Sequence, residues 1–294
     1  MIELAREVAR ALARRRPVVA LETTLVAHGF PAGEGLAVGL ESEAHIRETG
    51  AVPATVGVLD GKVRIGLTED ELQRFDGDAR KAGPRDLAAC AVQGAVGATT
   101  VGGTLAACRA AGIGFMATGG IGGVHRGERL DVSADLGELA RTEALVVCSG
   151  AKSLLDVPAT AELLETLGVP VLGFQTDLLP LFYSVGGGPP TSARVESAEE
   201  AARIAQAHWQ LGRHSALLLA RAPDHPLGDV APLIDRAVQE VEGAGLQGQE
   251  LTPALLARLN ELSEGRTLKA NKELVVGNAG LAAEVAVAYA KIAA

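Results

Sequence analysis

A lysine directly follows a short apolar run near the middle of the 294-residue chain. Residues 144–148 read Ala-Leu-Val-Val-Cys, and Ser149-Gly150-Ala151-Lys152 comes next. A buried strand that ends in small residues would hold the Lys152 amine partly out of water, and desolvation favours the neutral form of an amine. Only the neutral amine is a nucleophile, so imine chemistry is one interpretation. Phosphate binding by the same lysine is the other, and the residues alone favour neither.

Oxygen-bearing side chains gather shortly before that lysine, in Asp131-Val132-Ser133-Ala134-Asp135. In a helix Asp131 and Asp135 would share one face, and in a loop Ser133 would point with them. Carboxylate and hydroxyl oxygens suit Mg²⁺ or Mn²⁺. Helix N-capping by Asp131 or Ser133 is the alternative, and the pattern alone somewhat favours it. The preceding His125 is a metal ligand, a donor to a bound ligand or, by default, an ordinary loop residue.

Two more charged residues stand where loops leave predicted elements. Glu22 ends the apolar run 18–21, and a carboxylate is costly to bury unless it is paired or functional. A solvated strand end is the simpler interpretation, which the pattern alone favours. Lys81 lies in a loop, where it is by default a solvated charge and, functionally, a phosphate clamp. The small residues 97–104 allow either close approach of backbone N–H groups to a ligand or close helix packing.

These residues need a scaffold, and short apolar runs alternate with helical patterns along the chain. The apolar runs predict strands at 18–21, 54–59, 62–65, 113–117, 144–148, 168–174 and 216–220. Helices are predicted at 3–15, 34–49, 68–75, 87–96, up to 111, 153–167, 196–211, 228–245 and 252–265, with segments 267–271 and 275–279 before a final helix. Residues 60–61 predict a tight hairpin turn, and 185–193 a flexible loop.

This alternation predicts an α/β fold: a single catalytic domain over residues 1–294, with a mainly parallel central sheet flanked by helices on both sides (α/β/α). Folds of this class bind ligands where strands end, at the carboxyl edge of the sheet. The glycine-rich segment 118–123, the acidic pair and Lys152 would meet at that edge. A dinucleotide site is not expected, because residues 118–123 lack the G-x-G-x-x-G spacing.

Composition narrows the class of protein further. A formal charge of -9 and a pI near 5.3 argue against a nucleic-acid-binding surface, which needs a basic stripe. Cys90, Cys108 and Cys148 stand in apolar stretches without metal-type spacing, which indicates reduced thiols. The chain begins without a signal-peptide pattern, and no run of about 18 apolar residues predicts a membrane span. We therefore expect a cytoplasmic protein that binds neither nucleic acid nor membrane.

Eight segments together resemble the pseudouridine-5′-phosphate glycosidase family, also called indigoidine synthase A-like. The resemblance covers nearly the whole chain, and TGGIGGVHRG at 118–127 and SADL at 133–136 are its most specific parts. In chain order the segments are 20–29, 51–55, 59–62, 97–101, 118–127, 131–136, 149–153 and 173–177.

The resemblance implies a role for each matching residue. Glu22 would donate a proton, and Lys152 would be the nucleophile that forms an imine with the sugar. Lys81 would bind the substrate phosphate, and Asp131 would hold one Mn²⁺ per subunit, largely through water. Further substrate contacts are expected at Val101 (through its backbone), His125, Ser133, Ala134, Asp135 and Asn278.

The chain departs from the family pattern at a few positions near these residues. Thr23 stands where Ser is common, Phe30 where Met is common, and Gly102-Gly103 where Ala often occurs. Gly277 stands where the family often has a second asparagine beside Asn278, and residues 186–190 differ from the usual sequence of that loop in the family. The first three changes are conservative.

The implied activity is reversible cleavage of the C–C glycosidic bond of pseudouridine 5′-phosphate to uracil and ribose 5-phosphate, in nucleobase catabolism. The resemblance also implies a metal-dependent homotrimer that works with a separate pseudouridine kinase. Two alternatives from other classes are a non-catalytic sugar-phosphate-binding protein and another Schiff-base lyase acting on phosphosugars. Release of uracil from pseudouridine 5′-phosphate would distinguish the glycosidase activity from both alternatives.

Overall fold

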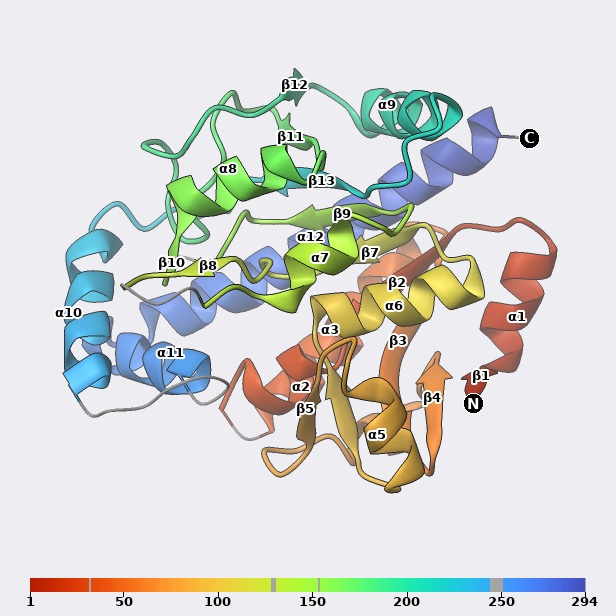
Figure 1. Ribbon diagram of the computed structural model, residues 1–294, viewed down its shortest axis with the longest axis horizontal. Helices are drawn as coiled ribbons and strands as arrows, with labels where there is room; N and C mark the ends of the chain where they lie inside the picture. The colour runs from red at the N-terminus through yellow and green to blue at the C-terminus, as the bar shows by residue number, and fades with distance from the viewer. Residues whose placement is uncertain (32, 128–130, 153, 244–250, 294) are drawn as a thin grey trace.

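Strands and helices alternate along the chain, of which the computed structural model describes residues 1–31, 33–127, 131–152, 154–243 and 251–293 (Figure 1). The strands are β1 (Ile2–Leu4), β2 (Val18–Glu22), β3 (Val52–Leu59), β4 (Lys62–Ile65), β5 (Arg80–Ala82), β6 (Gly97–Thr99), β7 (Phe115–Ala117), β8 (Val124–His125), β9 (Leu145–Cys148), β10 (Leu155–Asp156), β11 (Val171–Phe174), β12 (Ala193–Val195) and β13 (Leu217–Arg221). The helices are α1 (Arg6–Ala13), α2 (Thr24–His28), α3 (Glu34–Glu48), α4 (Glu69–Leu72), α5 (Leu87–Val92), α6 (Val101–Ala111), α7 (Ala134–Leu139), α8 (Val157–Thr166), α9 (Ala198–Gln210), α10 (Val230–Gly243), α11 (Leu251–Leu262) and α12 (Arg266–Ile292).

One 11-stranded sheet runs through the described chain in the order β1-β4-β3-β2-β7-β9-β13-β11-β12, and β6 connects β5 to β3. Every neighbouring pair from β3 through β2 to β12 is parallel. The antiparallel pairs in this sheet involve β3, which meets β4 and β6 in that sense. The predicted mainly parallel sheet is therefore confirmed. The predicted β3–β4 hairpin is also present, with Asp60 and Gly61 at φ 51° and 74°.

Helices cover both faces of the sheet, as β2 illustrates. Val18 and Ala20 belong to an apolar cluster shared with α1, α5, α6, α7 and α8. Val19 and Leu21 point to the other face and join a cluster shared with α3, α9 and α12. A strand buried on both sides reads as one continuous apolar run, which is why this sequence shows no alternation there. The α/β/α layering is thus confirmed.

The structure differs from the prediction near both ends of the chain. Residues 2–4 form β1 instead of starting a helix, because they pair with β4. Segments 267–271 and 275–279 are parts of one helix, α12. Gly277 does not end that helix; it makes room for Arg221, whose Nη1 would lie 2.6 Å from a Cβ at this position. Residue 153 and residues 244–245, at the limits of two predicted helices, lie outside the described residues.

Helix α12 is long and apolar enough to cross a membrane by length and composition. However, 56% of its most apolar window is buried in the fold. The helix packs on β2, β7 and β9 and lies against both α3 and α9 (Figure 1). These contacts are those of a core helix in a layered α/β fold.

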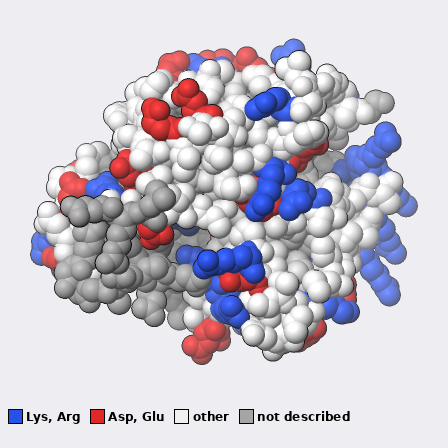
Figure 2. Space-filling view, viewed as in Figure 1, with Lys and Arg blue, Asp and Glu red and all other residues white. Residues whose placement is uncertain are grey.

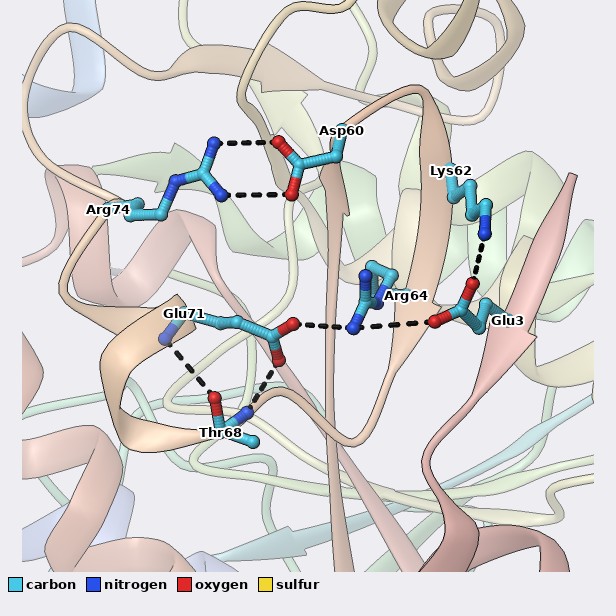
Figure 3. Close-up of polar contacts among 7 residues, drawn as sticks. All are labelled: Glu3, Asp60, Lys62, Arg64, Thr68, Glu71 and Arg74. Atoms are coloured by element: carbon cyan, nitrogen blue, oxygen red, sulfur yellow. Dashed lines mark hydrogen bonds and ion pairs between the residues drawn. The ribbon is translucent and has the colours of Figure 1, made fainter.

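Ion pairs tie the edge of the sheet formed by β1 and β4. We call them the edge network, which consists of Glu3, Asp60, Lys62, Arg64, Thr68, Glu71 and Arg74 (Figure 3). Arg64 Nη2 lies 2.5 Å from Glu71 Oε1 and 3.4 Å from Glu3 Oε1. Lys62 pairs with Glu3 as well. Two strands and the following helix are thereby connected through charges of opposite sign.

The turn beyond β4 completes the edge network. Arg74 donates two parallel hydrogen bonds to the Asp60 carboxylate, 2.9 and 2.8 Å long, and they lower the pKa of Asp60. The Thr68 hydroxyl caps α4 by accepting from the Glu71 backbone N–H at 3.3 Å, and the Glu71 carboxylate accepts from the Thr68 backbone N–H at 2.9 Å. Figure 2 shows basic groups gathered along the edge of the molecule where α1 lies, whereas elsewhere on this face basic and acidic groups of the described residues occur in smaller patches.

Candidate active site

A cavity opens where β2, β7 and β9 end. These strands are adjacent and parallel, so their carboxyl ends lie at one edge of the sheet. The cavity contains about 620 Å³ of space that no atom occupies, a figure that includes its opening to solvent. Its lining combines polar groups with apolar ones, among them Glu22, Lys81, Thr118, Lys152, Phe182 and Asn271. The structure therefore brings three of the predicted site residues, Glu22, Lys81 and Lys152, to one place.

Glu22 is the last residue of β2 and is only 6% exposed. Thr118, which follows β7, donates its hydroxyl proton to Glu22 Oε1 over 2.5 Å. Burial raises the pKa of Glu22, and the opposing effects of Lys152 and the Thr118 hydrogen bond do not cancel the rise. A carboxyl group with a raised pKa keeps its proton at higher pH than a solvated one and is suited to donate it to a substrate.

Lys152 lies in the tight connection that leaves β9. Its backbone N–H donates to the Ile121 carbonyl over 3.1 Å, which joins this connection to the glycine-rich loop after β7. Gly150 turns the chain with φ 89°, and a Cβ there would lie 2.2 Å from the Pro180 oxygen. The Lys152 side chain is half-buried and lines the cavity. Its amine makes no hydrogen bond or ion pair with any described residue, so it is available to a ligand.

Lys81 reaches the cavity from β5, a short strand within the segment that was predicted to be a loop. Burial lowers the pKa of Lys81, and the positive charge of Lys152 lowers it further. Within the described part of the chain this amine also has no hydrogen-bond or ion-pair partner. Next to it, His28 Nε2 donates to the Ala79 carbonyl over 2.9 Å and fixes the start of β5. Two cations near one carboxyl group form a site that attracts an anion.

Asp131 and Asp135 do not share a helix face, because α7 begins only after Ser133. Ser133 is the N-cap of α7 and accepts a hydrogen bond from the Asp135 backbone N–H at 3.2 Å, which confirms the capping alternative. Asp131 precedes the helix and is exposed, whereas Asp135 is buried. The Asp135 carboxylate accepts from the backbone N–H groups of Gly102 at 2.7 Å and Gly122 at 2.8 Å. It thereby holds the start of α6 against the glycine-rich loop.

A metal bound near Asp131 would have few protein ligands. Among the described residues, no group of three His, Cys, Asp or Glu side chains is placed to hold a metal ion. The Asp131 carbonyl accepts the backbone N–H of His125 at 2.9 Å, and His125 pairs with Leu155 in the small β8–β10 sheet. One exposed carboxylate fits the mode in which a hard cation keeps several waters and also binds a substrate phosphate. It does not fit a closed protein cage.

Two predicted contact residues are buried behind the cavity. Val101 is the first residue of α6 and is fully buried. Asn278 is also fully buried, and its Nδ2 donates to the Thr118 carbonyl at 2.9 Å and to Ser149 Oγ at 3.1 Å. It thus connects the exits of β7 and β9. The side chains of Ser133 and Ala134 lie at the start of α7, and the predicted substrate contacts of all four residues stay predictions.

Asn271 is a cavity residue that the sequence interpretation missed. It is 6% exposed and lines the cavity, yet its amide has no hydrogen-bond partner among the described residues. Asn271 and Asn278 are two helical turns apart, so they lie on the same face of α12. Recognising one continuous helix would have revealed this signal. An unpartnered amide that is nearly buried offers both a donor and an acceptor to a ligand.

Comparisons with known proteins agree with one another. The family described as "Indigoidine synthase A like protein" matches residues 7–288. A pseudouridine-5′-phosphate glycosidase of Sorangium cellulosum is 45% identical, covering 100% of this chain and 95% of its own. One of Streptomyces griseus is 48% identical over 98% and 92%.

Solved structures extend the likeness to three dimensions. The prealnumycin C-glycosynthase AlnA in complex with ribulose 5-phosphate is 38% identical with a TM-score of 0.90, covering 100% of this chain and 98% of its own. An indigoidine synthase A-like protein from Thermotoga maritima is 38% identical with a TM-score of 0.88, over 98% and 96%. The likeness therefore spans the whole sheet and the elements that form the cavity.

Proposed function

The chain belongs to the indigoidine synthase A-like family, and we propose that it cleaves the C–C glycosidic bond of pseudouridine 5′-phosphate to uracil and ribose 5-phosphate. The observation that carries this proposal is the meeting of Glu22, Lys81 and Lys152 in one cavity, where both amines lack partners among the described residues. Relatives with the name pseudouridine-5′-phosphate glycosidase match the full length of the chain. The structural neighbour bound to ribulose 5-phosphate supports a phosphosugar as ligand.

The residue types suit the difficulty of this reaction. In pseudouridine a carbon atom of uracil is attached to the sugar, so the leaving group has no oxygen or nitrogen at that bond to protonate. Two carboxylates, which suffice for ordinary glycosidases, therefore do not suffice here. A carboxyl group that opens the sugar ring, combined with an amine that can form an imine, provides a different route.

The proposed sequence of steps begins with proton transfer from Glu22 to the ribose ring oxygen. The neutral Lys152 amine attacks the anomeric carbon, and the bond from that carbon to the ring oxygen breaks. The attached nitrogen then returns a proton to the Glu22 carboxylate and so regains its lone pair. This lone pair forms a C=N bond while the C–C bond to uracil breaks and the base carbon takes up a proton. Water adds to the imine and releases ribose 5-phosphate and the free lysine. Lys81 holds the phosphate throughout, so the sugar stays oriented.

Metal dependence is a separate part of the proposal. Asp131 would hold one Mn²⁺, or another hard divalent cation, mainly through water, and the cation would organise water and neutralise phosphate charge. Titration of chelator-treated protein with Mn²⁺, followed by electron paramagnetic resonance, tests this directly. Asp131→Asn should weaken Mn²⁺ binding by about tenfold or more, whereas Asp235→Asn, an exposed control, should leave it unchanged. Equal Mn²⁺ binding by all three proteins would exclude Asp131 as the ligand.

The remaining expectations concern the oligomeric state, the location in the cell and a partner enzyme. We propose a homotrimer located in the cytoplasm, with a separate pseudouridine kinase supplying the substrate. Light scattering on the purified chain tests the oligomer, because a monomer of 30.1 kDa and a trimer differ threefold in mass.

One assay tests the proposed activity. Purified protein is mixed with pseudouridine 5′-phosphate, with and without Mn²⁺, and free uracil is measured by chromatography. We expect uracil and ribose 5-phosphate in equal amounts, and borohydride added with ribose 5-phosphate should attach the sugar to Lys152. Sugar-phosphate binding without uracil release would favour a non-catalytic binding protein. Turnover of a phosphosugar without uracil would favour another Schiff-base lyase.

A further inference from the structure

Phe182 has a backbone conformation that bulky residues seldom adopt. Its φ is 64°, in the left-handed region that is otherwise occupied mainly by glycine and asparagine. Such a conformation is unfavourable and persists only where the surroundings hold the residue in place. Strained residues of this kind are concentrated at ligand-binding sites, which makes the contacts of Phe182 informative.

Contacts with two other segments hold Phe182 and the adjacent Tyr183 in place. Its backbone N–H donates to the Ser149 carbonyl over 3.1 Å, at the beginning of the connection that carries Lys152. The following Tyr183 meets the Phe182 ring edge-to-face, with centroids 4.7 Å apart, and its carbonyl accepts from Leu227 at 2.7 Å. The Phe182 backbone is therefore tied to the connection that carries Lys152.

The Phe182 ring also explains a glycine in the loop after β7. A Cβ at Gly120 would lie 2.7 Å from two carbons of the ring, closer than real Cβ atoms approach. Gly120 and Phe182 both line the cavity that contains Glu22 and Lys152. The absence of a side chain at Gly120 thus lets an aromatic ring form part of the cavity wall.

Resting on the proposed function, we infer that Phe182 forms the aromatic wall against which the uracil ring of the substrate stacks. The charged groups of the cavity suit the other parts of the substrate. Lys81 suits the phosphate, and Glu22 and Lys152 suit the ring oxygen and the anomeric carbon. A hydrocarbon ring has no hydrogen bond to give to hydroxyls or phosphate, but its face matches a planar base. Phe182 is thereby a specificity-determining residue for the base and not for the sugar.

Kinetics in the direction of C–C bond formation can separate the two halves of the substrate. Phe182→Leu keeps an apolar side chain but removes the aromatic face. At saturating ribose 5-phosphate, we expect the KM for uracil to rise about ten- to a hundredfold, the range of one base–aromatic stack. The KM for ribose 5-phosphate and the yield of its borohydride-trapped adduct should stay within about twofold. Val185→Ala, at an exposed position of the same loop, should change neither KM.

A second variant keeps the test valid if Phe182→Leu does not fold. Phe182→Met, which is also apolar but lacks an aromatic face, should produce the same selective rise in the KM for uracil. The inference is overturned if both KM values rise together, or if neither changes, in a variant whose melting temperature is near that of the wild type. Failure of the wild type to make or release uracil would instead overturn the proposed function.

Discussion

The edge network and the cavity contain the same kinds of charged side chain, but these are paired in the edge network and unpaired in the cavity. In the edge network each charged group has a partner of opposite sign, as Arg64 has in Glu71 and Glu3 (Figure 3). In the cavity Lys81 and Lys152 have none among the described residues, although both are half-buried. A charge that is partly removed from water and left unpaired destabilises the fold unless a ligand completes it. Unpaired charge thus marks the site, and paired charge marks the scaffold.

The pKa values of two carboxyl groups reflect the same difference. The hydrogen bonds from Arg74 lower the pKa of Asp60, so this exposed carboxylate stays ionised. Burial raises the pKa of Glu22, so that group retains a proton more readily. A charged partner lowers the pKa of one carboxyl group, whereas burial raises the pKa of the other. Only the raised pKa, that of Glu22, produces a proton donor.

The comparison predicts that the largest effect of any single change will occur at Lys152. Lys152→Ala removes the only group proposed to bond covalently to the sugar, and we expect turnover to fall by on the order of a thousandfold or more. Lys152→Arg should not restore it, because arginine stays charged at all relevant pH values. Uracil release measures the effect, with Lys62→Ala as the control from the edge network. Substantial turnover by Lys152→Ala would contradict the imine route.

Glu22→Gln should have the next largest effect on rate. The amide cannot donate the proton that opens the ring, so kcat should fall by roughly 10²- to 10⁴-fold. In the wild type, activity that needs the protonated carboxyl should decline as pH rises through the raised pKa of Glu22. A pH profile of kcat/KM measures this decline. If Glu22→Gln retains full activity, the proton comes from another group.

Glu22→Gln should lower activity but raise the free energy of unfolding. The folded state binds the Glu22 proton more tightly than the unfolded state does, because its folded pKa is raised. The free energy of unfolding of the wild type therefore falls as pH rises from the unfolded pKa of the group through the folded one. Glu22→Gln removes this loss, so the variant should gain stability over the wild type above that window. Denaturant unfolding at pH 4 and pH 8 measures the gain. If the variant and the wild type differ in free energy of unfolding by the same amount at both pH values, the prediction is wrong.

Lys81→Met should reduce binding more than chemistry. Removal of the phosphate partner should raise the KM for pseudouridine 5′-phosphate by about ten- to a hundredfold, the range expected for a charge-assisted contact. Lys62→Met removes a lysine of the edge network and should leave KM unchanged. Steady-state kinetics on the two variants compares equal chemical changes in the two regions. Equal effects on KM would mean that the phosphate is held elsewhere.

The smallest effect should come from breaking the edge network itself. Arg64→Met separates β4 from both Glu3 and Glu71 and should lower the free energy of unfolding by about 0.5–1 kcal/mol. Activity should be unaffected, because none of these residues lines the cavity. Chemical denaturation and the uracil assay together measure both outcomes. A loss of activity without a loss of stability would break the division between scaffold and site.

The sequence could predict those parts of the fold that depend on local patterns. Strands such as β2 and β9 are continuous apolar runs, and residues 60–61 encode a hairpin turn, so their structure follows from neighbouring residues. Because Glu22 and Lys152 follow parallel strands, their approach at one edge of the sheet could be expected as well.

The parts that could not be predicted depend on contacts between distant residues. Segments 267–271 and 275–279 were expected to precede the final helix, yet they are parts of one helix, α12, which packs on β2, β7 and β9. Asn271 on this helix lines the cavity. Likewise, the spacing of Asp131 and Asp135 permitted a shared helix face, but Ser133 starts the helix between them. The partners of Asp135, Gly102 and Gly122, become visible only in the folded chain.

Helix α12 has a consequence for how the protein is synthesised. The Asn278 amide joins the exits of β7 and β9, and the helix packs on one side of those strands. A ribosome completes every strand of the sheet before it makes this helix, so the nascent polypeptide waits with a large apolar surface exposed. Domains of this size fold as units, so the emerging chain needs protection from aggregation until α12 docks. We expect a chain whose translation stalls before α12 to be inactive and prone to aggregation.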